Sequence, residues 1–190
     1  MWRRKANILV VMLFVCSKAH CQLLTLNNDT YYSVYDLGLQ CPHQVWWVLK
    51  PSDIGRVKRN PSWQFVNDIY HPLAQGTTTD YVHSGYHRGH MCPAKDRSNS
   101  LSRMQSTFTM SNIAPQTPSV NTGSWKATED WCRRTVMQFD SICILVQPVF
   151  MNRDTVYIGK HHLAVPHAFM KVAYLPQNDS VLNCWFIFNH

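Results

Sequence analysis

One segment governs how this chain of 190 residues is interpreted: YHRGHMCPAKDR, residues 86–97. His90 has a side chain suited to general-base chemistry near pH 7. The arginines beside it supply guanidinium groups, which bind phosphate through paired hydrogen bonds. Downstream, Asn121 and Glu129 supply oxygen atoms of the kind that Mg²⁺ prefers, and Mg²⁺ is often held by only one or two protein groups plus substrate phosphates. The combination predicts phosphoryl chemistry.

The rest of the chain predicts an α+β fold, because apolar strand-like runs lie on both sides of a single helix candidate. The helix begins at a cap, Asn121 or Thr122, and its apolar residues from Trp125 to Val136 recur at helical spacing. Pro, Gly and basic residues make residues 51–62 a loop, and residues 70–85 are also loop-rich. The expected strands are residues 44–49, 141–146, 156–158, 168–174 and 181–188.

Four motifs carry a family resemblance. They are Arg88-Gly89-His90, the following Met-x-Pro-x-x-Asp-Arg, Ser111-Asn112-x-x-Pro115-Gln116, and Asn121-x-x-x-Trp125-x-x-x-Glu129. In this order and spacing they resemble the DNA/RNA non-specific endonucleases, the ββα-metal nucleases with an Asp-Arg-Gly-His signature. The resemblance is strongest over residues 86–134 and extends back to Asp53-Ile54-Gly55 and Arg59-Asn60.

The resemblance implies a central antiparallel sheet with flanking helices and a loop-rich active-site segment. It implies a Mg²⁺ cofactor, for which Mn²⁺ can substitute, and DNA and RNA as substrates cleaved without sequence specificity to give 5′-phosphate ends. His90 matches the general base, Asn121 the direct metal ligand, and Glu129 a carboxylate that orients the water around the metal.

The resemblance also assigns residues that bind the charged phosphate. Arg88 matches the signature arginine, and Arg59 matches an upstream arginine that stabilises the charge added during attack. Arg133 and Asn112 match positions that line the same cleft.

One residue departs from the signature. The first signature position is usually Asp, and here it is His87. Imidazole replaces an acceptor-only carboxylate and can add positive charge. A non-catalytic nucleic-acid-binding protein of the same fold therefore remains open. A phosphodiesterase or phosphatase acting on small esters is a third function, because it would share the metal chemistry and differ in cleft length. A zinc site built from His83, His87 and His90 is a further alternative.

The N-terminus has the layout of a signal peptide. A basic start at Arg3, an apolar run from Ile8 to Cys16, and small residues at Ala19 and Cys21 predict a signal peptide over residues 1–21, cleaved before Gln22. A single domain over residues 22–190 and a secreted or periplasmic location follow. An uncleaved anchor, a buried N-terminal strand and a lipoprotein site are the alternatives.

Composition excludes some classes and leaves charge a weak argument. A chain with 45% apolar and 15% charged residues is not intrinsically disordered. The 18 basic and 11 acidic residues give +7, but four basic residues lie in positions 1–21, which leaves +3. The sequence contains no pair of CxxC motifs, which a zinc ribbon would require. Because five cysteines follow residue 21, at least one lacks a partner within the chain: Cys41, Cys92, Cys132, Cys143 and Cys184.

Overall fold

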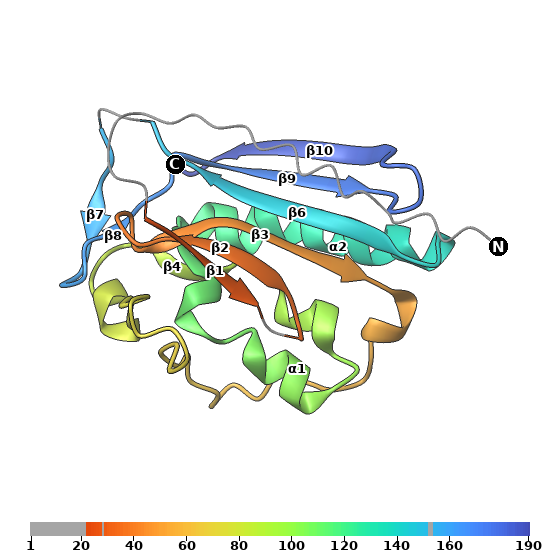
Figure 1. Cartoon of the computed structure of the whole chain (residues 1–190), viewed down its shortest axis with the longest axis horizontal. Coiled ribbons are helices and arrows are strands. Elements are labelled where there is room, and N and C mark those ends of the chain that lie inside the picture. Colours follow the sequence, from red (N-terminus) through yellow and green to blue (C-terminus); the bar gives the residue numbers. More distant parts are fainter. Residues whose placement is uncertain (1–21, 28, 152–153) are drawn as a thin grey trace.

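The computed structural model describes residues 22–27, 29–151 and 154–190. Its main element is a six-stranded sheet with the strand order β1-β2-β3-β6-β9-β10, in which every neighbouring pair is antiparallel. Figure 1 shows this sheet in front of the helix α2. The sheet strands are β1 (Leu23–Asn27), β2 (Tyr32–Asp36), β3 (Cys41–Leu49), β6 (Ile142–Val149), β9 (Ala168–Tyr174) and β10 (Val181–Phe188).

The long segment between β3 and β6 carries a second structural unit. Within it, β4 and β5 form a separate antiparallel pair, and α2 follows β5, so that the order is strand, strand, helix. A short helix, α1, lies between the two strands, and a small β7–β8 hairpin follows β6. The bounds are β4 (His87–His90), α1 (Leu101–Ser106), β5 (Ile113–Gln116), α2 (Trp125–Thr135), β7 (Tyr157–Ile158) and β8 (Leu163–Ala164). The expected α+β fold of the ββα-metal type is confirmed.

The core lies between the sheet and α2. Alternate residues of β6 are buried, as a strand with one covered face requires. On α2, Trp125, Thr128 and Cys132 are buried and recur at the spacing of one helix face. The Trp125 ring lies 5.3 Å from the Phe169 ring of β9, centroid to centroid. This contact fixes the first turn of α2 against the sheet.

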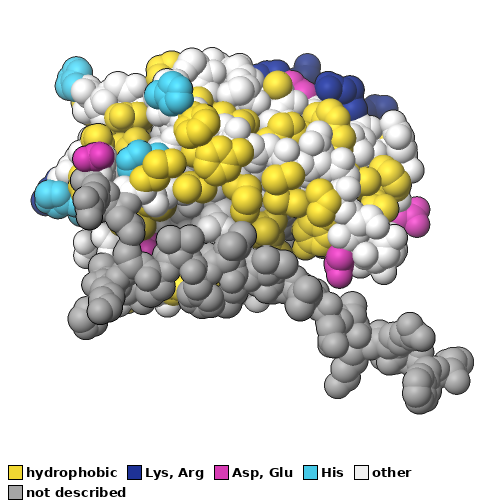
Figure 2. Space-filling model, turned by 90° about the horizontal axis from the view of Figure 1, so that it is seen from above, with side chains coloured by type: hydrophobic (Ala, Val, Ile, Leu, Met, Phe, Trp, Pro, Cys, Tyr) yellow, Lys and Arg dark blue, Asp and Glu magenta, His cyan; other side chains and the backbone are white. Residues whose placement is uncertain are grey.

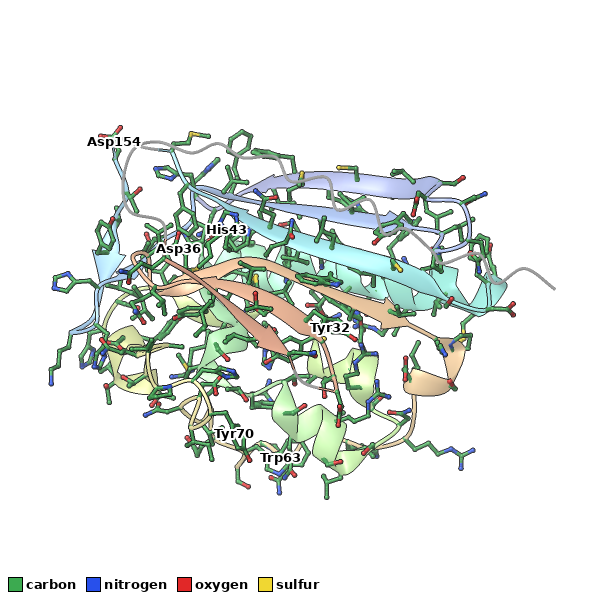
Figure 3. All side chains as sticks on the ribbon, in the orientation of Figure 1. Tyr32, Asp36, His43, Trp63, Tyr70 and Asp154 are labelled. Carbon is green, nitrogen blue, oxygen red and sulfur yellow. The ribbon has the colours of Figure 1, made fainter. Side chains whose placement is uncertain are left out.

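Adjacent tryptophans on β3 point to opposite faces, as the strand period of two requires. Trp47 is 2% exposed, and its indole Nε1 donates a hydrogen bond to the buried carboxylate of Asp96 at 3.1 Å. Trp46 lies on the outer face and stacks on Tyr32, with ring centroids 5.5 Å apart. Tyr32 stands on β2 in Figure 3. The sheet therefore uses one tryptophan for the core and one for its surface.

The strands expected at residues 44–49, 141–146, 156–158, 168–174 and 181–188 are all present, with small differences in their ends. The expected helix is present, but its expected cap is wrong. Residues Val120–Ser124 form a π-helical turn that runs directly into α2, and Ser119 already has helical φ and ψ. Asn121 and Thr122 therefore lie inside a helical segment. The sequence did not predict five strands, β1, β2, β4, β5 and β8, or the helix α1. Each spans six residues or fewer and carries little periodic signal.

Three further expectations concern cysteine, zinc and the N-terminus. All five cysteines of the described chain are free, in agreement with the odd number. Among the described residues, no group of three or more His, Cys, Asp and Glu side chains is placed to hold a metal ion, which disfavours the zinc alternative. The signal peptide expected over residues 1–21 lies outside the described residues. No helix in the described part of the chain is long and apolar enough to cross a membrane.

Exposed apolar side chains occur on both sides of the molecule. Figure 2 looks down on the β10 side of the molecule and shows hydrophobic side chains spread across it. On this edge strand Val181, Phe186 and Phe188 are exposed. On the opposite side, Trp63 and Tyr70 belong to the irregular segment between β3 and β4 (Figure 3), and Tyr70 is 83% exposed.

The hydrogen bond from Trp47 to Asp96 predicts a measurable loss of stability. Trp47→Phe keeps an aromatic side chain but removes a donor from a carboxylate that is completely buried. We expect the free energy of unfolding, measured by urea denaturation, to fall by about 1–3 kcal/mol. Trp46→Phe on the outer face is the matched control and should cost about 1 kcal/mol or less. Equal losses in the two variants would contradict this role of Asp96.

Candidate active site

A cleft of about 580 Å³ lies between the β4–β5 pair and α2. Six of the seven residues expected at the site line it, although they come from three separate parts of the chain. They are Arg59, Arg88, His90, Asn121, Glu129 and Arg133. The seventh, Asn112, does not line it.

The β4 strand presents the signature residues to this cleft. His87, Arg88 and His90 all line the cleft, and Gly89 between them is buried. Gly89 faces Ala114 across the β4–β5 pair, and a Cβ at residue 89 would overlap the buried side-chain amide of Gln116. A larger residue would have to displace the Gln116 side chain, which is fully buried, so this packing favours glycine. The Arg-Gly-His order is thus partly a packing requirement.

His90 lies in an aromatic setting that keeps its imidazole neutral. Its ring centroid is 5.3 Å from that of Phe65 and 4.9 Å from that of Phe108. Burial, together with the nearby Arg59 charge, lowers the pKa of His90 from 6.5 to about 3. Its Nε2 is buried and has no hydrogen-bond partner among the described residues. The neutral imidazole is the form that a general base needs.

The same two phenylalanines position two arginines. The Arg59 guanidinium lies over the Phe108 ring at 4.9 Å, and the Arg88 guanidinium lies over the Phe65 ring at 5.1 Å. Both arginines are exposed, so their charges remain available to a ligand in the cleft. Stacking on a ring restricts a long side chain without using its hydrogen-bond donors.

Asn121 occupies the π-helical turn that precedes α2. Its backbone N–H donates to the Thr117 carbonyl at 2.9 Å, and its side-chain Nδ2 lies 3.2 Å from His87 Nδ1. The π-turn changes the angle between Asn121 and the regular helix behind it, and such turns frequently occur at functional sites. Asn121 and Glu129 both line the cleft, so the helix presents both to a common space, as their spacing predicted.

A group of buried charges lies behind Glu129. Lys171 of β9 is 1% exposed, donates to Thr128 Oγ1 at 2.8 Å, and lies 3.6 Å above the Trp125 ring. Burial raises the pKa of Glu129 to about 7, against the opposing effect of the Lys171 charge. A carboxyl group with this pKa would lose its proton when a cation binds in the cleft, because the positive charge favours the ionised form.

Arg133 is held more firmly than a residue that simply awaits substrate. Its guanidinium donates to Asp96 at 2.8 Å and to Asp130 at 2.8 Å, and it lies 3.6 Å from Glu129. It is only 8% exposed. Arg133 therefore lines the cleft as expected, but its contacts are chiefly with protein carboxylates.

The expectation that Asn112 contacts substrate is wrong in this structure. Asn112 is fully buried, and its side-chain amide accepts from Cys92 N and donates to the carbonyls of Cys92 and Thr107. These bonds satisfy backbone groups just after β4, so Asn112 positions the chain next to His90. The motif identified asparagine at this position, but its role becomes clear only from its contacts, which are with backbone groups.

Sequence reasoning missed several residues that line or support the cleft. Phe65 lines it and Phe108 is buried behind His90; both lie in segments with no recognisable motif, and their role depends on contacts between distant parts of the chain. Tyr81 lines the cleft, is 6% exposed, and carries a hydroxyl with no partner among the described residues. Lys126 also lines the cleft, one residue after Trp125 in the fourth motif, a position from which the motif spacing could have placed it.

The chain is similar to known nucleases. The sequence model of the DNA/RNA non-specific endonuclease family matches residues 17–188. Human Endonuclease G, mitochondrial, is 33% identical over 118 residues, which are 57% of this chain and 40% of that protein. Nuclease 1, mitochondrial, from Schizosaccharomyces pombe is 32% identical over 158 residues, 76% of this chain and 49% of that protein. The chain thus spans about half the length of these relatives, or less.

A solved structure shares the fold. The crystal structure described as the EndoG/EndoGI complex superposes with a TM-score of 0.80 at 25% sequence identity, covering 87% of this chain and 74% of that one. This likeness extends well beyond the four motifs.

The relatives correct the expected location. A secreted or periplasmic protein was expected from the N-terminal sequence, but both relatives above, and others such as Nuclease EXOG from Danio rerio, are named as mitochondrial proteins. A basic N-terminal segment does not by itself distinguish secretion from mitochondrial targeting, because cationic N-terminal segments also occur in mitochondrial targeting sequences.

The lowered pKa of His90 predicts how stability depends on pH. The unfolded chain protonates this histidine below about pH 6.5, whereas the folded chain resists protonation until about pH 3. His90 therefore makes the free energy of unfolding decrease as pH falls from 6.5 towards 3, by up to about 1.4 kcal/mol per pH unit.

His90→Asn removes this contribution without emptying the site. Urea denaturation of both proteins at pH 6.5, 5.5 and 4.5 should show a steeper loss of stability in the parent. Because Glu129 is unchanged in both, its opposite contribution between pH 4.5 and 7 cancels in the comparison. Parallel pH curves for the two proteins would show that His90 is not held neutral by the fold.

Proposed function

The chain belongs to the DNA/RNA non-specific endonuclease family, and we propose that it hydrolyses the phosphodiester bonds of both DNA and RNA without sequence specificity. One observation carries the proposal: a single cleft contains a neutral histidine and exposed guanidinium groups. The residues that line it come from three parts of the chain, namely Arg59, the strand β4, and the π-helical turn with α2. These groups address phosphate and nearby oxygen atoms, which carry no base information. Residues 22–190 would act as a single catalytic domain.

His90 is proposed to accept the proton of the attacking water. Its Nε2 is buried and has no hydrogen-bond partner among the described residues, so Nδ1 is proposed as the nitrogen that faces the cleft, with the proton of the neutral ring on Nε2. The nearby arginines oppose protonation of the ring in the resting state. When a phosphate occupies the cleft, its negative charge offsets the arginines and makes the imidazole a stronger base.

Arg59 and Arg88 are proposed to neutralise the charge that builds up on the phosphoryl oxygens. A phosphodiester resists attack because its own charge repels the nucleophile. The two guanidinium groups lie over the rings of Phe108 and Phe65, and both rings also contact His90. The arginine side chains are therefore already restricted before the substrate binds, which reduces the conformational entropy lost on binding.

The donor atoms of the cleft fit a divalent cation with hard-ligand preferences. Asn121 supplies an amide oxygen, and Glu129 supplies a carboxyl whose raised pKa would return towards normal beside a cation. Asn121 would hold Mg²⁺, with Mn²⁺ as a substitute, and Glu129 would orient its water. When bound, such an ion offsets charge on a non-bridging oxygen and on the leaving O3′ oxygen. Water attack opposite O3′ would leave a 5′-phosphate and a 3′-hydroxyl.

His90→Ala tests the proposed base. With Mg²⁺ present, the parent protein should degrade supercoiled plasmid and RNA, and EDTA should stop both reactions. The variant should cleave at least 100-fold more slowly, because general-base catalysis typically contributes a factor of about 10² to 10⁴. The rates come from gel assays, with circular dichroism to show that the fold survives.

His190→Ala is the matched control, because this histidine is exposed at the end of the chain and does not line the cleft. Full activity in His90→Ala would exclude this mechanism. If the parent protein retains DNA without cleaving it under any metal condition, the non-catalytic binding protein is the correct function. Cleavage of small phosphate esters alone would favour the third alternative.

The two stacked arginines predict a specific salt dependence. In a His90→Ala background without added metal, replacing Arg59 or Arg88 by Ala should remove about one phosphate contact. The slope of log affinity for duplex DNA against log salt concentration should then fall by about 0.9 for each replacement.

Arg134→Ala is the control, because Arg134 is exposed on α2 but does not line the cleft. Fluorescence anisotropy with labelled duplexes measures all four proteins. Equal slopes in the Arg59, Arg88 and Arg134 variants would mean that the cleft is not where the phosphates bind.

A further inference from the structure

We propose that His87 is a second protein ligand for the divalent cation, so that the ion is held by one nitrogen and one oxygen atom. This inference rests on the proposed function, which places a cation at Asn121. It gives a role to the residue that departs from the family signature. A cation site with an imidazole ligand should prefer transition metals over Mg²⁺ more strongly than a site with an asparagine ligand alone.

The first support is that His87 and Asn121 meet in the cleft. They are 34 positions apart, on β4 and in the π-helical turn, and both line the cleft. His87 Nδ1 lies 3.2 Å from Asn121 Nδ2. His87 is exposed, so the space beside the pair is open to water and to phosphate.

The second support is the separation itself. A half-turn of the Asn121 amide exchanges Nδ2 for Oδ1, which brings two acceptor atoms to about the same distance as the present contact. Two lone pairs so close repel each other unless a proton or a cation lies between them. Neighbouring ligands of an octahedral ion, with bonds of about 2.1 Å, are separated by about 3 Å. The pair therefore has the spacing of two adjacent ligands.

The third support is the charge around the pair. Glu129 and Asp130 line the same cleft. Asp130 is already paired with Lys126 at 2.7 Å and with Arg133 at 2.8 Å, so Glu129, which lies 3.6 Å from Arg133, is the carboxylate left to favour a cation. An aspartate at position 87 would have added a further negative charge. With histidine there, the site gains a softer donor and loses that charge, which shifts its preference from Mg²⁺ towards Ni²⁺, Co²⁺ and Mn²⁺.

A purely positioning role makes a different prediction. If His87 only accepts a hydrogen bond from Asn121, then a side-chain amide at position 87 should replace it, because an amide oxygen is also an acceptor. His87→Gln would keep the affinity for Ni²⁺ under that role. Under the ligand role, His87→Gln and His87→Ala both lose a strong nitrogen donor.

Isothermal titration calorimetry with Ni²⁺ and with Mg²⁺ measures the difference, on protein freed of any histidine tag and without nucleic acid. We expect the Ni²⁺ affinity to fall at least tenfold in His87→Ala and in His87→Gln, with a change of less than threefold for Mg²⁺. His87→Asp should reverse the preference, losing Ni²⁺ affinity and gaining Mg²⁺ affinity. His83→Asn is the matched control, because His83 is an exposed histidine four positions upstream that does not line the cleft.

Nuclear magnetic resonance gives a second readout. In ¹⁵N-histidine-labelled protein, diamagnetic Zn²⁺ should shift the Nδ1 resonance of His87, which is assigned by its loss in His87→Gln. An unmoved resonance, or Ni²⁺ affinities within twofold in the parent and His87→Ala, would overturn the inference.

The nuclease assay separates this inference from the proposed function. If cleavage depends on Mg²⁺ and His90 but Ni²⁺ binding does not depend on His87, only the inference fails. If Ni²⁺ binding depends on His87 but no metal supports cleavage, the proposed function fails and the metal site stands.

Discussion

The buried carboxylate of Asp96 is the interaction on which the arrangement of the site depends. It accepts one hydrogen bond from Trp47 on β3 and one from Arg133 on α2, while its own backbone follows the strand that carries His90. Removing one partner of a buried ion pair leaves an uncompensated charge, which typically costs about 3–5 kcal/mol. The sheet, the helix and the signature segment are therefore fixed to one another through a single group. The next residue, Arg97, adds a second connection through the carboxylate of Asp53.

Two phenylalanines contact both the proposed base and the arginines of the cleft. Phe65 and Phe108 pack against the His90 ring and remove part of it from water, which favours the neutral imidazole. Their other contacts hold Arg59 and Arg88, whose charges remain exposed. The two aromatic rings thus keep His90 uncharged while the neighbouring arginine side chains keep the positive charges that attract phosphate. Both properties would be lost if the histidine and the arginines shared one aqueous surface.

Two of the residues expected at the site make contacts different from those expected. Asn112 belongs to a recognisable motif, yet its amide is used entirely on backbone groups beside β4. Arg133 lines the cleft, yet three carboxylates surround it. Residue type and spacing placed Arg133 in the cleft but not Asn112, because whether a polar side chain turns towards the cleft or towards backbone depends on neighbours that are distant in sequence.

The sequence by itself determined the α+β class, the long strands, the helix behind the site and six residues of the cleft. It did so because apolar periodicity and short motifs are local properties of the chain. Only the tertiary structure decided most of the short strands, the π-helical turn in place of a cap, the roles of Phe65 and Phe108, and the contact between His87 and Asn121. Each of these depends on contacts between segments tens of residues apart, whose free energy comes from packing and desolvation after the chain has closed, and no local pattern records it.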